Sequence, residues 1–205
     1  IRGSQKTKTF VYLWIGSRHM LSLAKASEEG RIYTCTASLL LSAFMIEAYL
    51  NHLGSLRNKE WEKIERKIPK LEKYKIFSEA VNIPFDQNRQ QHKSLLDLFK
   101  FRDSMAHSKT TTDIIDTQLE TQLPMSIIPS TAWQKFATLE NAEQVSDDSI
   151  IFIFLSDIVL VKTKSNFDCN FFSFLMKCSG LIPTIFRPFF SEYVGNQSHC
   201  SKITS

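Results

Sequence analysis

The stretch TASLLLSAFMIEAYLNHLG (residues 36–54) carries the strongest helical pattern in the chain. Its apolar positions repeat at alternating intervals of four and three residues: Leu39, Ala43, Ile46, Leu50 and Leu53. These intervals place them on one face of an α-helix. Gly54 is a residue type that typically ends a helix, so we predict a stop there. A neighbouring stripe ends in Glu47 and Asn51, which are four residues apart and therefore share a face.

Further helices are predicted on both sides of this stretch. They cover about residues 8–28, 55–75, 95–107 and 138–161. The most apolar run, residues 149–161, is too short to span a bilayer and contains Asp157, so we expect a buried helix and no membrane contact. The predicted fold is an all-α, up-and-down bundle of four to five helices within residues 1–164.

Two segments have no such pattern. Residues 110–132 contain two prolines and are expected to form a loop. The tail, residues 165–205, holds seven of the chain's phenylalanines: Phe167, Phe171, Phe172, Phe174, Phe186, Phe189 and Phe190. Because so many phenylalanines would not normally face water, we expect this extension to pack on the bundle or at an interface.

The composition is that of an ordinary globular protein. The chain has 205 residues, 43% of them hydrophobic, and a formal net charge of +4. None of its four cysteines lies in a CxxC pair and no secretory signal opens the chain, so we expect reduced thiols and a cytoplasmic location. Three cysteines and a histidine near the end (Cys169, Cys178, His199, Cys200) fit no compact zinc motif, and we expect neither metal nor cofactor.

The segment 55–75 is basic. It contains eight Lys and Arg against four Glu, a difference of +4. It has helical spacing and an interruption near Pro69, so one interpretation is an amphipathic helix with a solvated face. The other is that its basic face binds a phosphate backbone. The side chains that would do so are Lys63, Arg66, Lys67 and Lys70.

An arginine interrupts the apolar stripe of the helix near residues 95–107. This stripe consists of Leu95, Leu98, Phe99, Arg102, Met105 and Ala106. Burying an unpaired guanidinium is costly, so Arg102 requires a carboxylate, an anionic ligand or a wet crevice. A structural salt bridge with Glu47 is one solution, and His107 would then be a helix cap. The other solution is a ligand site.

Asp103 and His107 are four residues apart on the same helix. A carboxylate at this spacing can accept a hydrogen bond from one ring nitrogen of the imidazole, which would fix its tautomer. Arg102 and His107 lie five residues apart, about 140° around the helix, and converge on one ligand only near a helix end or across a seam.

The stretch RDSMAH, Arg102 to His107, resembles the R-x4–6-H signature of HEPN domains, the higher-eukaryote and prokaryote nucleotide-binding domains. A polar residue directly after the arginine is usual in that family, and Asp103 is such a residue. Residues 42–53 look like the second helix of these domains, and a segment containing Trp133 before a last helix is similar too. The resemblance covers about residues 10–160.

This resemblance implies a homodimeric helical bundle with the active site at the interface. Its implied chemistry is metal-independent RNA cleavage, with His107 moving a proton and Arg102 binding the phosphate. Asp103 would orient the site, and Glu47 and Asn51 would support it. Many members are toxins or defence proteins, so a cognate antitoxin or regulatory protein is an expected partner. The alternative is a non-catalytic module of the same fold that binds RNA, a nucleotide or a partner protein.

One subgroup of the family carries a tyrosine two residues after the histidine. Here that position is Lys109. Regulation by modification of that tyrosine is therefore not expected.

Overall fold

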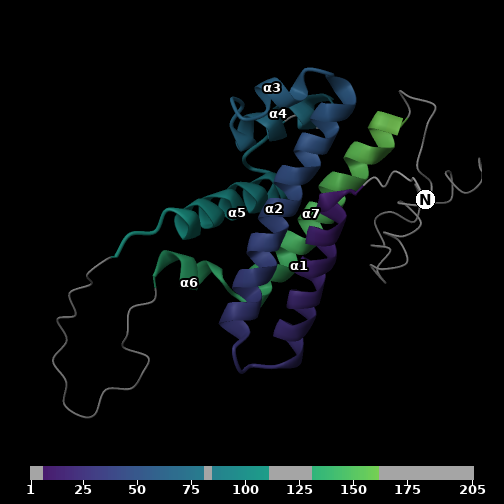
Figure 1. The fold of residues 1–205 in the computed structure, drawn as a ribbon. Helices are drawn as coiled ribbons and strands as arrows, with labels where there is room; N and C mark the ends of the chain where they lie inside the picture. Colours follow the sequence, from purple (N-terminus) through teal and green to yellow (C-terminus); the bar gives the residue numbers. More distant parts are fainter. Residues whose placement is uncertain (1–6, 81–84, 111–130, 162–205) are drawn as a thin grey trace, which may run out of the picture. The chain divides into compact units, whose positions relative to one another are not determined.

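The computed structural model describes residues 7–80, 85–110 and 131–161, with side chains as far as residue 153 in the last range. These residues form seven helices and no strand (Figure 1). In chain order they are α1 (Thr9–Ala26), α2 (Arg31–Arg57), α3 (Trp61–Ile64), α4 (Lys70–Ala80), α5 (Gln90–Ala106), α6 (Ala132–Phe136) and α7 (Leu139–Val161). Five have eleven residues or more, and the predicted all-α bundle is confirmed.

The basic segment 55–75 is interrupted near Pro69, as predicted, with separate helices before and after it. The short α3 is followed by a turn, and α4 begins directly after Pro69. Proline lacks a backbone N–H and is best tolerated at a helix start, so its place here follows from its chemistry. Gly30, which precedes α2, has a φ of 69°, a left-handed conformation that glycine adopts without a steric penalty.

Gly54 does not end a helix, contrary to the sequence prediction. It is buried inside α2, which continues to Arg57. A Cβ added at this position would lie 2.0 Å from a ring carbon of Trp61. The glycine is therefore required by the indole that lies against the helix, not by the helix terminus. The helix ends where the backbone N–H of Asn58 donates to the Gly54 carbonyl, at 2.9 Å.

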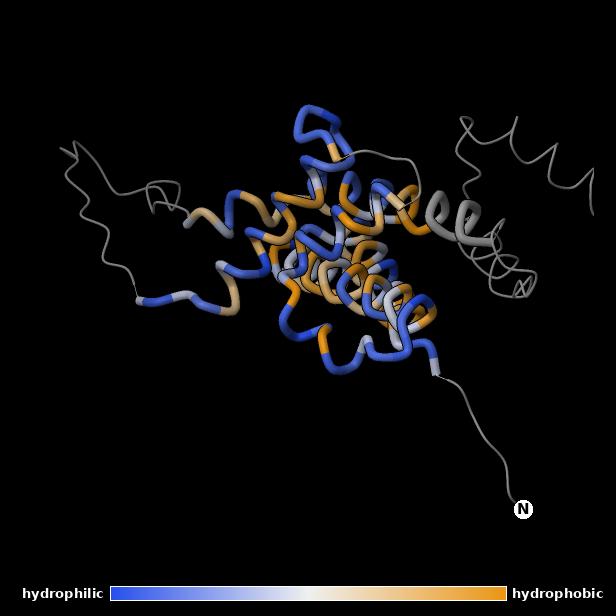
Figure 2. The backbone as a smooth tube through the Cα atoms, turned by 90° about the horizontal axis from the view of Figure 1, so that it is seen from above, coloured by the Kyte–Doolittle hydropathy of each residue, from blue (hydrophilic) through white to orange (hydrophobic). Residues whose placement is uncertain are grey.

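Helix α2 is the centre of the bundle. It packs along α1 and also contacts α3, α4 and α5 (Figure 1). The Tyr49 hydroxyl donates to the carbonyl of Ile153 at 3.2 Å, which ties α2 to α7. Figure 2 shows hydrophobic segments where the helices meet and hydrophilic segments in the connecting turns. Such contacts from several sides explain why apolar residues of α2 occur on more than one face.

An aromatic cluster fills the space between four helices. Tyr49 is fully buried and packs edge-on against Phe10 of α1, with ring centroids 5.3 Å apart. Phe152 of α7 lies 6.3 Å from Tyr49 and 4.7 Å from Tyr74 of α4. Aromatic pairs at these separations contribute about 0.5–1.5 kcal/mol beyond the area they bury.

Small polar side chains line the contact between α1 and α2. The Ser17 hydroxyl donates to the Ser38 carbonyl at 3.0 Å, and the Ser38 hydroxyl donates to the Ser17 carbonyl at the same distance. Ser42 lies 2.7 Å from Ser17, oxygen to oxygen. All three serines are buried, so these bonds satisfy groups that would otherwise be costly to remove from water.

The apolar run predicted as a buried helix lies in α7. Its first described side chains include the buried Ser149, Phe152 and Ile153. Among the described helices, it is instead α2 that is long and apolar enough to cross a membrane by length and composition, with 44% of its most apolar stretch buried inside the protein. Core helices of globular proteins have this property as well.

Several predictions concern residues outside the described ranges. These are the loop over most of residues 110–132, the Phe-rich tail 165–205, and the cysteines at 169, 178 and 200 with His199. The described helices belong to one compact unit that reaches Leu160. The remaining cysteine, Cys35, is a free, buried thiol, and burial raises its pKa above the ordinary value.

Replacing Gly54 with alanine should destabilise the fold. The new methyl group would overlap the Trp61 ring, and overpacking of this kind costs about 1–3 kcal/mol. Gly16→Ala is the matched control, because a Cβ there meets the flexible end of Leu41 at 3.3 Å and alanine gains about 1 kcal/mol of helix propensity. Urea denaturation followed by circular dichroism measures both. Equal stability of the two variants would contradict this account of Gly54.

Candidate active site at the end of α5

The last turn of α5 carries the three residues of the predicted motif. Arg102 and Asp103 lie inside the helix, and His107 is its C-cap, whose backbone N–H donates to the Asp103 carbonyl at 3.0 Å. The start of the predicted apolar stripe is confirmed, since Leu95, Leu98 and Phe99 are buried. Further along, the same face leaves the core: Arg102 and Met105 are half-buried, while Ala106 and His107 are exposed.

Arg102 pairs with Glu47 of α2. Its Nε lies 3.4 Å from Glu47 Oε1, and its Nη2 donates to Oε2, also at 3.4 Å. Each side chain is 25% exposed. Arg102 Nε and Glu47 Oε1 are nevertheless buried atoms without a well-formed hydrogen bond. The salt bridge considered from the sequence is present, but it is longer than the about 2.7–2.9 Å of a strong charge-assisted bond.

The Arg102 guanidinium also lies over an aromatic ring. Its central carbon is 5.6 Å from the centroid of Phe44, a side chain of α2 that is 41% exposed. The negative face of the ring attracts a cation at this distance. Glu47 and Phe44 are three residues apart and therefore hold the guanidinium from the same face of α2.

The Asp103 carboxylate does not meet His107, contrary to expectation. It accepts two hydrogen bonds from Lys70 Nζ, at 2.5 and 2.6 Å, and one from Arg102 Nη1 at 3.1 Å. Lys70 reaches it from α4, and a lysine ammonium offers a full positive charge where the imidazole offers one ring N–H. The link to His107 is therefore the backbone cap alone.

The surroundings of Asp103 act on its pKa in two directions. Partial burial raises the pKa of the carboxyl, and the hydrogen bonds and charges of Lys70 and Arg102 lower it. The second influence is larger, so the pKa of Asp103 lies below its ordinary value. The ionised carboxylate is thereby held in place as the negative charge between two cations.

Asn51 accepts a hydrogen bond from Lys73, a lysine of α4 that was not among the predicted site residues. Lys73 Nζ donates to Asn51 Oδ1 at 2.7 Å and lies 5.8 Å from the centroid of Trp61. Lys73 is 9% exposed, and this burial lowers its pKa although nearby Glu65 and Glu47 raise it. Lys73 could have been predicted from its position three residues after Lys70, because this spacing puts both lysines on one face of α4.

The predicted basic surface divides into two parts. Lys70 joins the site. Lys63, Arg66 and Lys67 are exposed on α3 and the turn after it, and Lys63 pairs with Glu60. None of these three has an ion pair with the Glu47–Arg102–Asp103 group among the described residues. Their exposure is compatible with both interpretations, a solvated face and a surface for a phosphate backbone.

The cluster of Glu47, Arg102, Asp103 and Lys70 holds two cations and two carboxylates at unequal distances. Lys70 is tightly held by Asp103, whereas Arg102 is held by Glu47 through long contacts. A phosphate oxygen can form shorter bonds with the planar fork of the guanidinium than Glu47 does. The exposed His107 lies one turn further along α5. Within the described ranges, no three His, Cys, Asp or Glu side chains gather closely enough to hold a metal ion.

Comparison of the chain with models of known protein families, with curated proteins and with solved structures finds no match.

Replacing Arg102 with alanine should lower the free energy of unfolding by about 1–2 kcal/mol. The Glu47 oxygens would lose their cation, although partial exposure keeps the loss below the about 3–5 kcal/mol of a fully buried pair. Arg66→Ala, on the exposed turn, is the control and should change the value by less than about 0.5 kcal/mol. A Glu47→Ala/Arg102→Ala double variant losing the full sum of both single losses would show that the two side chains are not coupled.

Asp103 should also make the free energy of unfolding depend on pH in the acidic range. Because its folded pKa is lowered, its contribution is fully present above the unfolded pKa, near 3.8, and is lost as pH falls through the folded pKa. Unfolding midpoints measured from pH 6 down to about pH 2 should fall more gently in Asp103→Asn than in wild type. Identical pH profiles for the two proteins would contradict the Lys70–Asp103–Arg102 arrangement.

Proposed function

We propose that this protein is a metal-independent endoribonuclease of the HEPN type. The observation that carries the proposal is the presence, five residues apart at the end of α5, of a half-buried arginine and an exposed histidine. The resemblance of RDSMAH to the R-x4–6-H signature, and the order of helices in which it occurs, support it further. A cytoplasmic toxin or defence effector, controlled by an antitoxin or regulatory protein, is the setting that this resemblance suggests.

The reaction begins with attack of an RNA 2′-OH on the adjacent phosphorus. The new O2′–P bond forms as the P–O5′ bond breaks, which leaves a 2′,3′-cyclic phosphate and a free 5′-OH. One group must take the proton from the 2′-OH and another must supply a proton to the departing O5′. Histidine suits either role because it exchanges protons near neutral pH.

Arg102 would act on the phosphate. As negative charge grows on the non-bridging oxygens, the guanidinium can exchange its long contacts with Glu47 for bidentate contacts to the phosphate. Asp103 and Lys70 would hold the last turn of α5 in position, and Asp103 also holds one guanidinium nitrogen. The two carboxylates thus position Arg102 and do not themselves touch the reacting atoms.

One chain supplies a single His107, whereas the reaction needs two proton transfers. A homodimer with two such helix ends facing each other would supply the second histidine, as the resemblance implies. Lys63, Arg66 and Lys67, which are exposed, would then remain available for the RNA backbone outside the cleft.

The second candidate is a non-catalytic module that binds RNA, a nucleotide or a partner protein. The observation that favours it is that Arg102 is already occupied by Glu47 and Asp103, as in a structural salt bridge. Such a protein would bind its ligand without turnover.

The deciding assay is cleavage of a mixed RNA by purified protein in EDTA. His107→Ala should lose about 10²–10⁴-fold of the activity, because a proton transfer is removed. The fold should be unaffected, since the exposed side chain is removed and the capping N–H is kept. His19→Ala, which removes an exposed histidine of α1, should retain full activity.

Product analysis completes this test. Wild-type products should carry 2′,3′-cyclic phosphates and free 5′-OH groups. Full activity of His107→Ala would refute the mechanism. Binding of RNA with no turnover by wild type would favour the non-catalytic module.

A further inference from the structure

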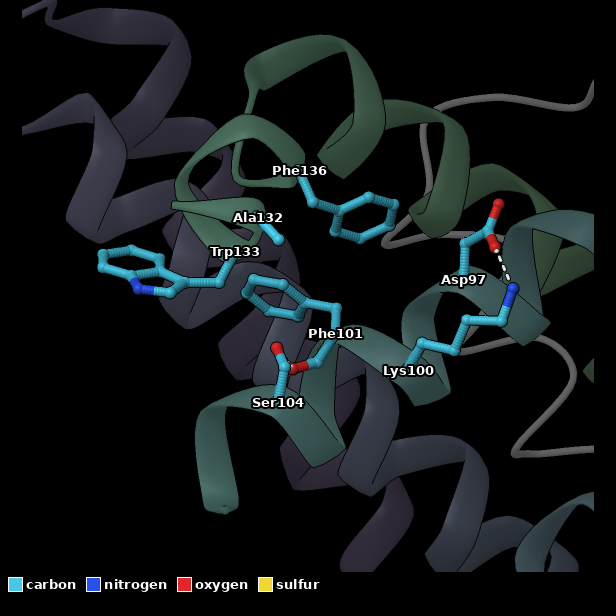
Figure 3. Close-up of a pocket in the computed structure, with 7 residues that line it drawn as sticks. All are labelled: Asp97, Lys100, Phe101, Ser104, Ala132, Trp133 and Phe136. Atoms are coloured by element: carbon cyan, nitrogen blue, oxygen red, sulfur yellow. Dashed lines mark hydrogen bonds and ion pairs between the residues drawn. The ribbon is translucent and has the colours of Figure 1, made fainter. Parts of the chain in front are cut away.

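A second feature of α5 lies on a different face of the helix from Arg102. A cleft of about 230 Å³ separates α5 from α6 (Figure 3). Its lining consists of Asp97, Lys100, Phe101, Ser104, Ala132, Trp133 and Phe136. In Figure 3 Trp133 stands at one end and the Asp97–Lys100 ion pair at the other, with Phe101 and Phe136 between them.

The cleft presents aromatic side chains that contacts between α5 and α6 hold in place. Phe101 is buried, and its ring lies 5.2 Å from that of Phe136, which holds the short α6 against α5. The start of α6 is fixed by a capping box, in which Gln134 accepts from the backbone N–H of Thr131 at 2.8 Å. Trp133 therefore presents a partly exposed indole on α6, a helix that these contacts fix in position. The other two tryptophans, Trp14 and Trp61, are buried.

Charged and hydroxyl side chains lie around the cleft. Lys100 is 74% exposed at the rim, and Lys109 and Lys135 are exposed on the neighbouring segments. Asp97 and the Ser104 hydroxyl add hydrogen-bonding groups to the apolar lining. The cavity is smaller than the about 300–1,000 Å³ that encloses a drug-sized ligand, and its size suits one ring system.

Around α5, the cleft lies nearer to His107 than to Arg102, because Ser104 is about 60° from His107 and about 160° from Arg102. Ser104 lies three residues before His107, about 4.5 Å along the helix axis. A base held between α5 and α6 would therefore place its sugar and phosphate on the His107 side of the helix end.

We infer that this cleft binds a nucleobase of single-stranded RNA, stacked on Trp133, on the His107 side of the proposed active site. Proteins recognise unpaired RNA by stacking its splayed bases on aromatic side chains, in a basic setting that follows the backbone. This inference rests on the proposed function, because it names the part of the substrate that the same site would hold. Trp133 is a binding residue in it and takes no part in proton transfer.

Tryptophan fluorescence tests the inference without turnover. The probe is a single-stranded RNA of about ten nucleotides, 2′-O-methylated throughout so that no 2′-OH is available for cleavage. Stacking should quench the emission of Trp133, and Trp133→Phe should abolish the quench because Trp14 and Trp61 are buried. An unchanged wild-type spectrum at saturating RNA would overturn the inference.

Affinity for the same oligonucleotide supplies the second measurement. Trp133→Ala should bind about ten-fold more weakly, and Trp133→Phe should recover most of the loss, since stacking needs a flat ring. Tyr12→Ala is the control, because it removes an aromatic ring of α1 that is 64% exposed and does not line the cleft. Unchanged RNA affinity of Trp133→Ala together with a changed oligomeric state would assign the cleft to a second copy of the chain and overturn the inference.

The two proposals fail differently. RNA-dependent quenching of Trp133 without cleavage of an unmodified RNA would support the base site and refute the ribonuclease. Cleavage that depends on His107, with no effect of Trp133→Ala on RNA affinity, would support the ribonuclease and refute the base site.

Discussion

A chain of four charged side chains, Glu47, Arg102, Asp103 and Lys70, connects α2, α4 and α5 at one end of α5. A guanidinium on the apolar side of α5 is tolerated because a carboxylate of α2 lies opposite it. Asp103 extends the chain of charges to Lys70 and so fastens α4 to the same point. The three helices are thus joined by four alternating charges.

This arrangement combines one tightly bonded ion pair, Lys70–Asp103, with one loosely bonded pair, Arg102–Glu47. The Lys70–Asp103 contacts are short, so the frame is fixed, while the Arg102–Glu47 contacts are long. Under the proposed function Arg102 would accept an incoming anion, and such a division would favour this because the cost of ordering the side chain has already been met in folding. The same geometry would serve a binding module as well as a nuclease, and chemistry at His107 is what distinguishes the two.

The helices were predictable because their pattern is local. Spacing in α2 and α5 shows which faces are buried, and Pro69 marks a break that neighbouring residues alone determine. Long-range contacts were not predictable. The four-residue spacing of Asp103 and His107 is real, but Lys70, 33 residues away in sequence, takes the carboxylate. Likewise, Gly54 is required by its contact with Trp61, which the helical spacing of α2 does not reveal.

The close approach of Trp61 to Gly54 has an evolutionary consequence. A ring seated directly on a helix backbone leaves room for hydrogen and nothing larger, so neither position can change freely while the other is kept. Among descendants of a common ancestor, a side chain at position 54 should appear only together with a smaller residue at position 61. Covariation of this pair would mark the chain's lineage even where the charged residues of α5 have been replaced.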